Sequence, residues 1–252
     1  MANRLLGVIS AIPEELSHLA DESGGRIAVG GLSYLKGHIA GRDAIFVECG
    51  MGKVNAGVAT ALMLDRFPCT ALMFCGVAGG LDPALGVGDV VVGTRNIQYD
   101  YGAELETGFK AYQPGKPPLP GFDDVHGYEV PLDLIERLRL AAADVTFDAL
   151  PESVGAGRRL PRVSFGPIAT GDCFVNSERT RKRLHGSYGA QACEMEGGAV
   201  AQVAERFGNL PLVNVRCLSD LAGAESHLDF GAFLPIAARN ASLVAHKLAP
   251  VI

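Results

Sequence analysis

The stretch from Gly52 to Cys75, GKVNAGVATALMLDRFPCTALMFC, contains a helix pattern followed directly by a buried strand. Between Gly52 and Phe67 the larger apolar residues recur three or four positions apart, which is the spacing of one helix face. After Pro68, the run Ala71–Cys75 is apolar at every position. Such a run is typical of a strand that is covered on both faces of a parallel sheet. This unit therefore predicts an α/β fold.

The same alternation continues on both sides of this unit. The further strands that we expect are Leu5–Ser10, Ser33–Ile39, Asp43–Cys49, Asp89–Gly93, Arg162–Ala169 and Leu212–Leu218. The further helices that we expect are Pro13–Ala20, Leu132–Ala142, Ser177–Leu184, Gly197–Phe207 and Phe230–Leu248. Gly41-Arg42 predicts a hairpin between its two flanking strands, and Gly102–Tyr128, with GKPPLPGF inside it, predicts a long irregular loop. Without a break in composition or a repeat, we expect one domain over residues 1–252, with a largely parallel sheet covered on both faces.

Composition and charge exclude several classes of protein. The 252 residues include 48% apolar and 20% charged residues, which excludes a disordered chain. Lys and Arg number 22 against 28 Asp and Glu, so the net charge of −6 has the wrong sign for a nucleic-acid binder. No apolar run reaches the ~18–20 residues that span a bilayer, and the start of the chain shows no signal-peptide cleavage site. We expect a cytoplasmic protein without a membrane or nucleic-acid partner.

Cysteine and histidine patterns do not indicate a metal centre. The six cysteines show no C-x-x-C spacing and mostly stand beside apolar residues, so we interpret them as free, buried thiols. The six histidines are scattered, without a second ligand at helical spacing. A G-x-S-x-G nucleophile elbow is also missing.

Ionisable residues interrupt apolar sequence at three expected strand ends. They are Glu14 and Glu15 in the first segment, Glu194 and Glu196 in the second, and Arg216 and Asp220 in the third. In open α/β sheets, ligands bind at the carboxyl ends of the strands, and a buried carboxylate without a partner costs several kcal/mol. Each segment also has a structural interpretation: the helix dipole for the first, ion pairing for the second, and an Arg216–Asp220 salt bridge for the third.

Two glycine-rich segments are weaker signals. Gly50-Met51-Gly52-Lys53 lacks the spacing of a phosphate loop, and Gly76–Gly80 lacks the spacing of a dinucleotide-binding turn. We interpret Gly76–Gly80 as a tight turn after a strand, at which a ligand could approach the backbone.

Several segments together resemble a known family. Glu-Met-Glu-Gly (194–197), Val-Arg-x-x-Ser-Asp (215–220) and Ser-His-Leu-x-Phe (226–230) occur in this order. Further matching stretches are Gly7–Leu16, Gly50–Asn55, Gly76–Asp89 and Ala169–Asn176. With these stretches the chain resembles, over nearly its whole length, the 5′-methylthioadenosine/S-adenosylhomocysteine nucleosidases of the nucleoside phosphorylase superfamily.

The resemblance implies a fold and a reaction. The fold would be a three-layer α/β/α sandwich around a mixed, largely parallel sheet, in a homodimer with no metal or organic cofactor. The reaction would be hydrolysis of the N-glycosidic bond of a small-molecule nucleoside. The substrates would be 5′-methylthioadenosine, S-adenosylhomocysteine or 5′-deoxyadenosine, and the products adenine and a 5-substituted ribose.

The resemblance also implies catalytic roles. Glu15 would be the base that activates water, with Arg216 near the water. Asp220 would supply the proton to purine N7, and Ser219 would help to hold that geometry. Independently of the resemblance, breaking a glycosidic bond requires these two tasks, which glycosidases divide between two carboxylates.

Further positions would bind the substrate. Glu196 would hold the ribose hydroxyls, and Met195 would pack along the sugar. Phe174 and Val175 would stack on the purine and present backbone groups to its edge. The remaining residues that would line the pocket are Met51, Val77, Gly79 and Phe230.

Two departures from the family pattern leave alternatives open. Val77 stands where relatives often carry Ser or Thr, and valine donates no hydrogen bond to water or phosphate. Gln98–Gly102 replaces an aspartate-rich segment, and the loop after it differs, which makes that loop a candidate cover for the 5′-substituent of its own or a partner's site. A purine nucleoside phosphorylase, a futalosine-type nucleosidase, a non-catalytic nucleoside-binding module and a nicotinamide-dependent oxidoreductase are the alternatives. Glu14 and Glu15 would repel a phosphate dianion, and the dinucleotide fingerprint is missing.

Overall fold

The computed structural model describes residues 5–20, 24–122, 126–150, 159–223 and 226–252, with the backbone alone for 226–232. Its strands are β1 (Leu5–Ser10), β2 (Arg26–Val29), β3 (Leu32–Ile39), β4 (Arg42–Glu48), β5 (Cys69–Gly80), β6 (Val90–Gln98), β7 (Gly102–Leu105), β8 (Gly108–Ala111), β9 (Tyr128–Glu129), β10 (Val163–Thr170), β11 (Ala192–Glu194) and β12 (Leu212–Asp220). Its helices are α1 (Pro13–Leu16), α2 (Lys53–Arg66), α3 (Leu132–Ala142), α4 (Glu178–Tyr188), α5 (Gly197–Arg206) and α6 (Ser226–Leu248), followed by a 3₁₀ turn at Ala249–Val251.

One mixed sheet forms the centre of the described structure, in the order β11-β10-β6-β12-β5-β1-β4-β3-β2. Strands β4, β1, β5 and β12 are parallel neighbours. Strand β10 is parallel to both β6 and β11, whereas β12 and β6 are antiparallel. The sheet therefore changes strand direction between β12 and β6.

Strand β11 also pairs with the end of β5, where Ala192 lies opposite Gly80 and Cys193 opposite Gly79. The strands β11, β10, β6, β12 and β5 therefore close on themselves at one end of the sheet. The closure is tight, because a Cβ on Gly79 would come within 3.1 Å of an Asp220 carboxylate oxygen.

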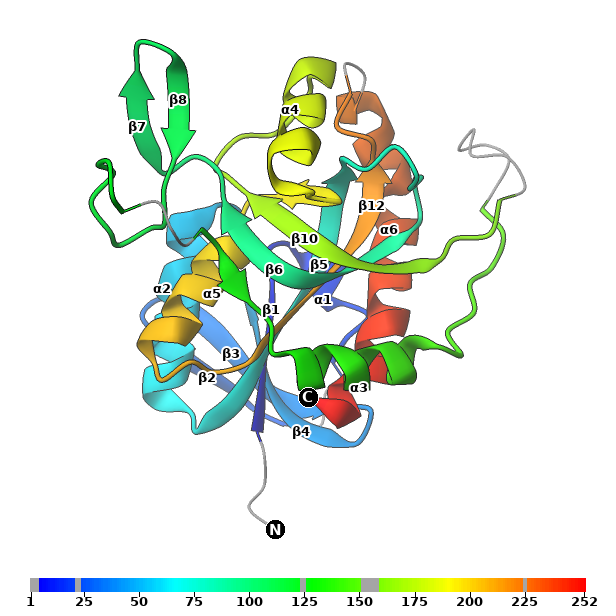
Figure 1. The fold of residues 1–252 in the computed structure, drawn as a ribbon. Helices are drawn as coiled ribbons and strands as arrows, with labels where there is room; N and C mark the ends of the chain where they lie inside the picture. Colours follow the sequence, from blue (N-terminus) through cyan, green and yellow to red (C-terminus); the bar gives the residue numbers. More distant parts are fainter. Residues whose placement is uncertain (1–4, 21–23, 123–125, 151–158, 224–225) are drawn as a thin grey trace.

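Helices cover both faces of the sheet (Figure 1). On one face, Leu6 and Val8 of β1 belong to the apolar cluster that includes Val244 of α6. On the other face, Ile9 packs in the cluster that includes Ala56 of α2 and Val200 of α5. Since successive side chains of a strand point to opposite faces, a strand between two helical layers is apolar throughout, and the predicted three-layer α/β/α sandwich is confirmed. No helix in the described ranges is long and apolar enough to cross a membrane.

Three sequence predictions of local structure need correction. The helix expected over Pro13–Ala20 is limited to Pro13–Leu16, because the next hydrogen bond, from Leu19 N–H to Leu16 O, has the i−3 spacing of a turn. Gly76–Gly80 is not a turn but the last part of β5, since β12 and β11 supply partners for its backbone. The region Gly102–Tyr128 is not wholly irregular, because it contains the hairpin β7–β8, which turns at Glu106-Thr107 and starts its second strand at Gly108 with φ +110°.

Candidate active site

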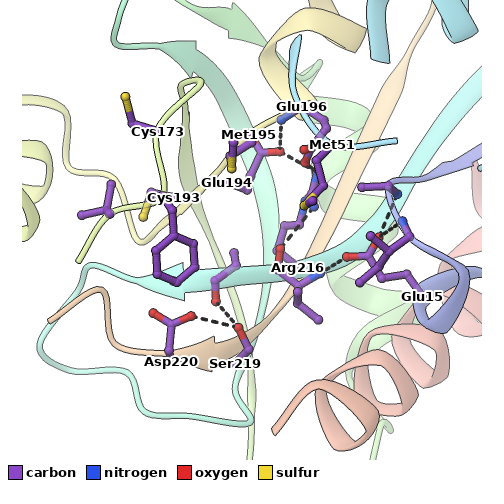
Figure 2. Close-up of a pocket in the computed structure, with 17 residues that line it drawn as sticks. Glu15, Met51, Cys173, Cys193, Glu194, Met195, Glu196, Arg216, Ser219 and Asp220 are labelled. Atoms are coloured by element: carbon purple, nitrogen blue, oxygen red, sulfur yellow. Dashed lines mark hydrogen bonds and ion pairs between the residues drawn. The ribbon is translucent and has the colours of Figure 1, made fainter. Parts of the chain in front are cut away.

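A cavity of about 100 Å³ opens at the carboxyl ends of β1, β5, β11 and β12. It collects the predicted site residues Glu15, Met51, Val77, Gly79, Phe174, Val175, Met195, Glu196, Arg216, Ser219 and Asp220. Figure 2 shows Glu15, Glu196 and Asp220 arranged around the same space, with Arg216 between them. The backbone of the remaining predicted residue, Phe230, lies in α6, and its side chain lies outside the described part of the chain. The sequence therefore identified most of the lining residues, although Glu15 and Asp220 are 205 positions apart in the chain.

Glu15 is held by backbone N–H groups from two elements. Its Oε2 accepts hydrogen bonds from Ala11 (2.8 Å) and Ile12 (3.3 Å), and its Oε1 accepts one from Val77 (2.9 Å). Burial raises the pKa of this carboxyl above its ordinary value, although Arg216 and the three N–H donors act in the opposite direction. A Cβ on Gly76 would lie 2.5 Å from Glu15 Oε1, so only glycine leaves room for the carboxylate there. A buried carboxyl with a raised pKa is suited to accept a proton near neutral pH.

Arg216 is 1% exposed and is the centre of the polar network. Its Nη2 lies 2.5 Å from Oε2 of Glu194, and its Nε donates to Oδ1 of Asn214 at 2.9 Å. Its Nη1 donates to the carbonyl of Val77 at 3.2 Å, and the guanidinium lies 4.1 Å from the centre of the Phe74 ring. The Arg216 ion pair with Glu194 shows that ion pairing, one of the interpretations left open for the 194–196 segment, is correct for Glu194.

The sequence missed the role of Glu194 in the site. This carboxylate lines the cavity beside Glu196 and also accepts hydrogen bonds from the N–H groups of Glu196 (2.9 Å) and Gly197 (2.7 Å). Thr170 donates its hydroxyl hydrogen to the other oxygen. Glu194 thus accepts hydrogen bonds both from the free N–H groups at the start of α5 and from Arg216. In the sequence, the only signal for this role was the close spacing of two glutamates in the motif.

Val77 takes part in the network through its backbone. Its N–H donates to Glu15 and its carbonyl accepts from Arg216, while its side chain lines the cavity. The replacement of a hydroxyl side chain at this position therefore leaves both backbone contacts in place.

Glu196 directly precedes α5, and the charges of Arg216 and Glu194 act on its carboxyl group. Its Oε1 accepts a hydrogen bond from the Gly52 N–H at 2.8 Å, and its Oε2 lies 3.5 Å from Arg216 Nη2. Burial, joined by the charges of Glu194 and Glu15, raises its pKa to about 7, against the opposing effects of Arg216 and the Gly52 N–H.

This pKa predicts how stability depends on pH. Between pH 4.5 and about 7, the unfolded chain releases the Glu196 proton while the folded chain retains it, so this group destabilises the fold as the pH rises. Glu196→Gln removes that titration. We expect the melting temperature of the variant, relative to the unchanged protein, to increase by several degrees from pH 5 to pH 8 in thermal unfolding measurements. Parallel melting curves over this pH range would show that Glu196 has an ordinary pKa.

Asp220 ends β12 at the opposite side of the cavity from Glu15 (Figure 2). Its Oδ1 accepts a hydrogen bond from the Ala222 N–H at 2.8 Å, and its Oδ2 lies 3.0 Å from the Ser219 hydroxyl. Both contacts come from residues within two positions of Asp220, so local contacts help to orient its carboxyl group.

The cysteines are free thiols, as expected. Five are buried, but Cys173 is exposed at the cavity, which corrects the expectation of burial for that residue. Burial raises the pKa of the Cys193 thiol well above its ordinary value, with Asp220 adding to the effect. In the described part of the chain, no three His, Cys, Asp or Glu side chains form a group that could hold a metal ion.

Comparison with known proteins identifies the family of the chain. Residues 5–250 match the phosphorylase superfamily. A 5′-methylthioadenosine/S-adenosylhomocysteine nucleosidase from Mycobacterium bovis is 40% identical over 249 residues, which are 98% of this chain and 97% of the relative. The chain belongs to this nucleosidase family. It is therefore an enzyme of the class that hydrolyses N-glycosidic bonds.

Solved nucleosidases share the whole fold. The enzyme of that name from Neisseria meningitidis, in complex with methylthio-immucillin-A, is 28% identical with a TM-score of 0.79, over 99% of this chain and all of the other. A futalosine hydrolase from Helicobacter pylori is 25% identical with the same TM-score, over 99% of both chains. Nucleosidases with different named substrates thus share this architecture.

Proposed function

We propose that this nucleosidase hydrolyses the N-glycosidic bond of 5′-substituted adenosines to adenine and a 5-substituted ribose. The substrates would be 5′-methylthioadenosine, S-adenosylhomocysteine and 5′-deoxyadenosine. One observation carries the proposal: three carboxylates, Glu15, Glu196 and Asp220, come from separate segments to line one cavity. The first two substrates are those in the name of the 40% identical relative.

Cleavage of the bond leaves negative charge on the departing purine, which Asp220 is placed to neutralise. A carboxyl group at the purine side can donate a proton to N7, so that a neutral base leaves. The Ser219 hydroxyl and the Ala222 N–H hold its two oxygens in one orientation. This supports Asp220 as the general acid.

The ribose becomes positively charged as the base departs, and Glu15 would activate the water that attacks it. Its carboxylate is fixed by three N–H groups, and its pKa is raised by burial, so it can take a proton from water as the new bond forms. The positive charge of Arg216 is offset by its ion pairs with Glu194 and Glu196. A phosphate dianion would meet the Glu15 carboxylate, which favours hydrolysis over phosphorolysis.

Glu196 would accept hydrogen bonds from the ribose hydroxyls. Such bonds to a carboxylate are stronger than bonds between neutral groups, and they strengthen as the sugar becomes cationic. Met195 would pack along the sugar, and Phe174 with Val175 would bind the purine. Met51 and Val77 belong to the lining that would surround the rest of the nucleoside.

The identity of the 5′-group is a separate part of the proposal. The hairpin β7–β8 projects from the body of the molecule (Figure 1), and its Leu105 and Phe109 side chains are exposed. We propose that this hairpin covers the 5′-substituent, either in the cavity of its own chain or in the cavity of a second copy. The futalosine hydrolase of the same fold supports a futalosine-type nucleoside as the alternative substrate.

We further propose that the chain acts as a cytoplasmic homodimer of single domains over residues 1–252, with no metal or organic cofactor. The exposed side chains of Met51, Val54 and Val58 support the dimer, because they form an apolar surface along α2 and the turn before it.

Product analysis tests the reaction. Purified protein is expected to release adenine and free 5-methylthioribose from methylthioadenosine in phosphate-free buffer, at a rate that added phosphate does not change. Chromatography of the sugar product distinguishes free 5-methylthioribose from 5-methylthioribose 1-phosphate. Strict dependence on phosphate would establish a phosphorylase instead. A panel with S-adenosylhomocysteine, 5′-deoxyadenosine and futalosine would rank the 5′-groups by kcat/KM.

The ribose contact has its own test. Glu196→Gln is expected to lower kcat/KM for methylthioadenosine by about 10-fold or more, as expected for loss of a charged hydrogen bond worth ~1.5–3 kcal/mol. The same variant should lose much less on the 2′-deoxy substrate, because the partner hydroxyl is already missing. Equal losses on both substrates would mean that Glu196 does not touch this hydroxyl.

A further inference from the structure

Three polar residues just outside the cavity form a closed ring of contacts. The Lys53 ammonium lies 2.6 Å from Oδ1 of Asp100, and Oδ2 of Asp100 accepts a hydrogen bond from the Asp172 N–H at 2.8 Å. Oδ1 of Asp172 in turn accepts a hydrogen bond from the Lys53 N–H at 2.8 Å. Each residue therefore contacts the other two, and we call Lys53, Asp100 and Asp172 the latch.

The latch joins two segments that form the rim of the cavity. Lys53 follows Met51 by two residues, and Asp172 directly precedes the segment Cys173–Val175; both Met51 and that segment line the cavity. Asp100 comes from a third place, two residues after the end of β6. The three latch residues do not line the cavity themselves. Their contacts therefore act on the position of the rim rather than on a bound molecule.

The latch also completes the start of α2. The N-cap residue of this helix, Gly52, has no side chain to accept the first free N–H groups, which need partners. Two carboxylates from distant segments supply them: Glu196 accepts from Gly52, and Asp172 accepts from Lys53. Negative charge is favourable at this end of a helix dipole. The start of α2 thus contacts both Glu196, which is assigned to the ribose, and Asp172, which precedes the segment assigned to the purine.

Asp172 is exposed, but the ion pair of Lys53 with Asp100 is mostly shielded from solvent. The side chains of Lys53 and Asp100 are 17% and 22% exposed, so water screens this ion pair less than a surface pair. The two oxygens of Asp100 serve two different segments, the ammonium of Lys53 and the backbone of Asp172. Asparagine has only one acceptor oxygen and no charge, so it cannot replace both contacts.

We propose that Lys53, Asp100 and Asp172 are positioning residues that hold the segment Cys173–Val175 against the Met51 turn and thereby determine the affinity of the site for the purine half of its substrate. The proposal rests on the proposed function in one respect, the assignment of Phe174 and Val175 to the purine. It adds three residues that stand outside the cavity lining to the residues assigned to the site.

Kinetics of Asp100→Ala, Asp100→Asn and Lys53→Met test the proposal. We expect Asp100→Ala to raise KM for methylthioadenosine about 10-fold and to raise the inhibition constant of adenine by the same factor, while kcat changes less than about 3-fold. The two constants change together because both molecules use the purine subsite, and kcat is preserved because Glu15 and Asp220 keep their own contacts. Asp100→Asn should show a smaller change in the same direction.

Matched variants separate the latch from a general loss of stability. Lys247→Met removes a surface pair of the same type, Lys247 with Asp144 at 2.9 Å, and should leave KM and the adenine constant unchanged. The latch acts as a unit. The double variant Lys53→Met with Asp100→Asn should therefore raise KM no more than the more impaired of the two single variants does. Additive losses in this cycle, or a fall in kcat with unchanged KM in Asp100→Ala, would overturn the proposal.

Hydrogen exchange measured by mass spectrometry gives a readout without substrate. Asp100→Ala is expected to speed exchange in the segments 50–56 and 171–176 together, whereas Lys247→Met should change neither. An increase in only one of the segments would overturn the latch. If the unchanged protein released no base from any adenosine, the proposed function would fail, while this comparison would still decide whether the latch exists.

Discussion

Asp220→Asn is expected to lower kcat for methylthioadenosine by about 10²–10⁴-fold, the usual contribution of a general acid. Asparagine keeps the size of the side chain and can still accept from the Ala222 N–H, so the variant should fold. It has no acidic proton for purine N7, and the base must then leave as an anion. Steady-state release of adenine at saturating substrate measures the effect.

A substrate with a better leaving group distinguishes this role from a structural one. In a 4-nitrophenyl riboside the leaving group is 4-nitrophenolate, which departs without protonation at a ring nitrogen. Asp220→Asn should therefore cleave this substrate nearly as fast as the unchanged enzyme does. Equal losses of kcat on both substrates would indicate that the substitution disturbs the whole cavity rather than the acid alone. Normal turnover of methylthioadenosine by the variant would remove Asp220 from the role of acid.

Glu15→Gln is expected to lower kcat by a similar factor of about 10²–10⁴ on both the natural substrate and the nitrophenyl riboside. Water must be deprotonated whichever group leaves, and an amide does not accept that proton. The amide also presents only one acceptor oxygen to the N–H groups of Ala11, Ile12 and Val77, so a donor is left without its partner.

The neighbouring carboxylate provides a matched control. Glu14 is exposed, whereas Glu15 is buried, although both stand in the single turn of α1. Glu14→Gln should therefore retain kcat within about 2-fold, an effect expected for an exposed group. If Glu14→Gln and Glu15→Gln lose activity equally, the charge of the turn matters rather than one general base.

The fold could be predicted because its signal is local. Leu5–Ser10 and Ala71–Cys75 are apolar at most or all positions, and both became parts of parallel central strands between two helical layers. The prediction failed where pairing decides the structure. Gly76–Gly80 has the composition of a turn, yet it continues β5 because β12 and β11 lie beside it.

The predicted site residues converged for a related reason. Carboxyl ends of parallel strands meet at one edge of a sheet, so charges after β1 and within β12 had to lie near one another once the strands were parallel. Glu194 was different, because its importance comes from Arg216, 22 residues away, and from the free N–H groups at the start of α5. Its partners became known only when the strands were placed in order.

The sequence by itself determined the layered α/β architecture, the nucleosidase resemblance and three acidic residues of the cavity, Glu15, Glu196 and Asp220, since short apolar runs and contiguous motifs carry each of these signals. Tertiary structure alone decided which carboxylate pairs with Arg216, why Gly76 leaves room for Glu15, and how Glu196 and Asp172 complete the start of α2. The physical reason is that the free energy of a buried charge depends on the donors and charges around it. Those neighbours come from segments that only the folded chain brings together.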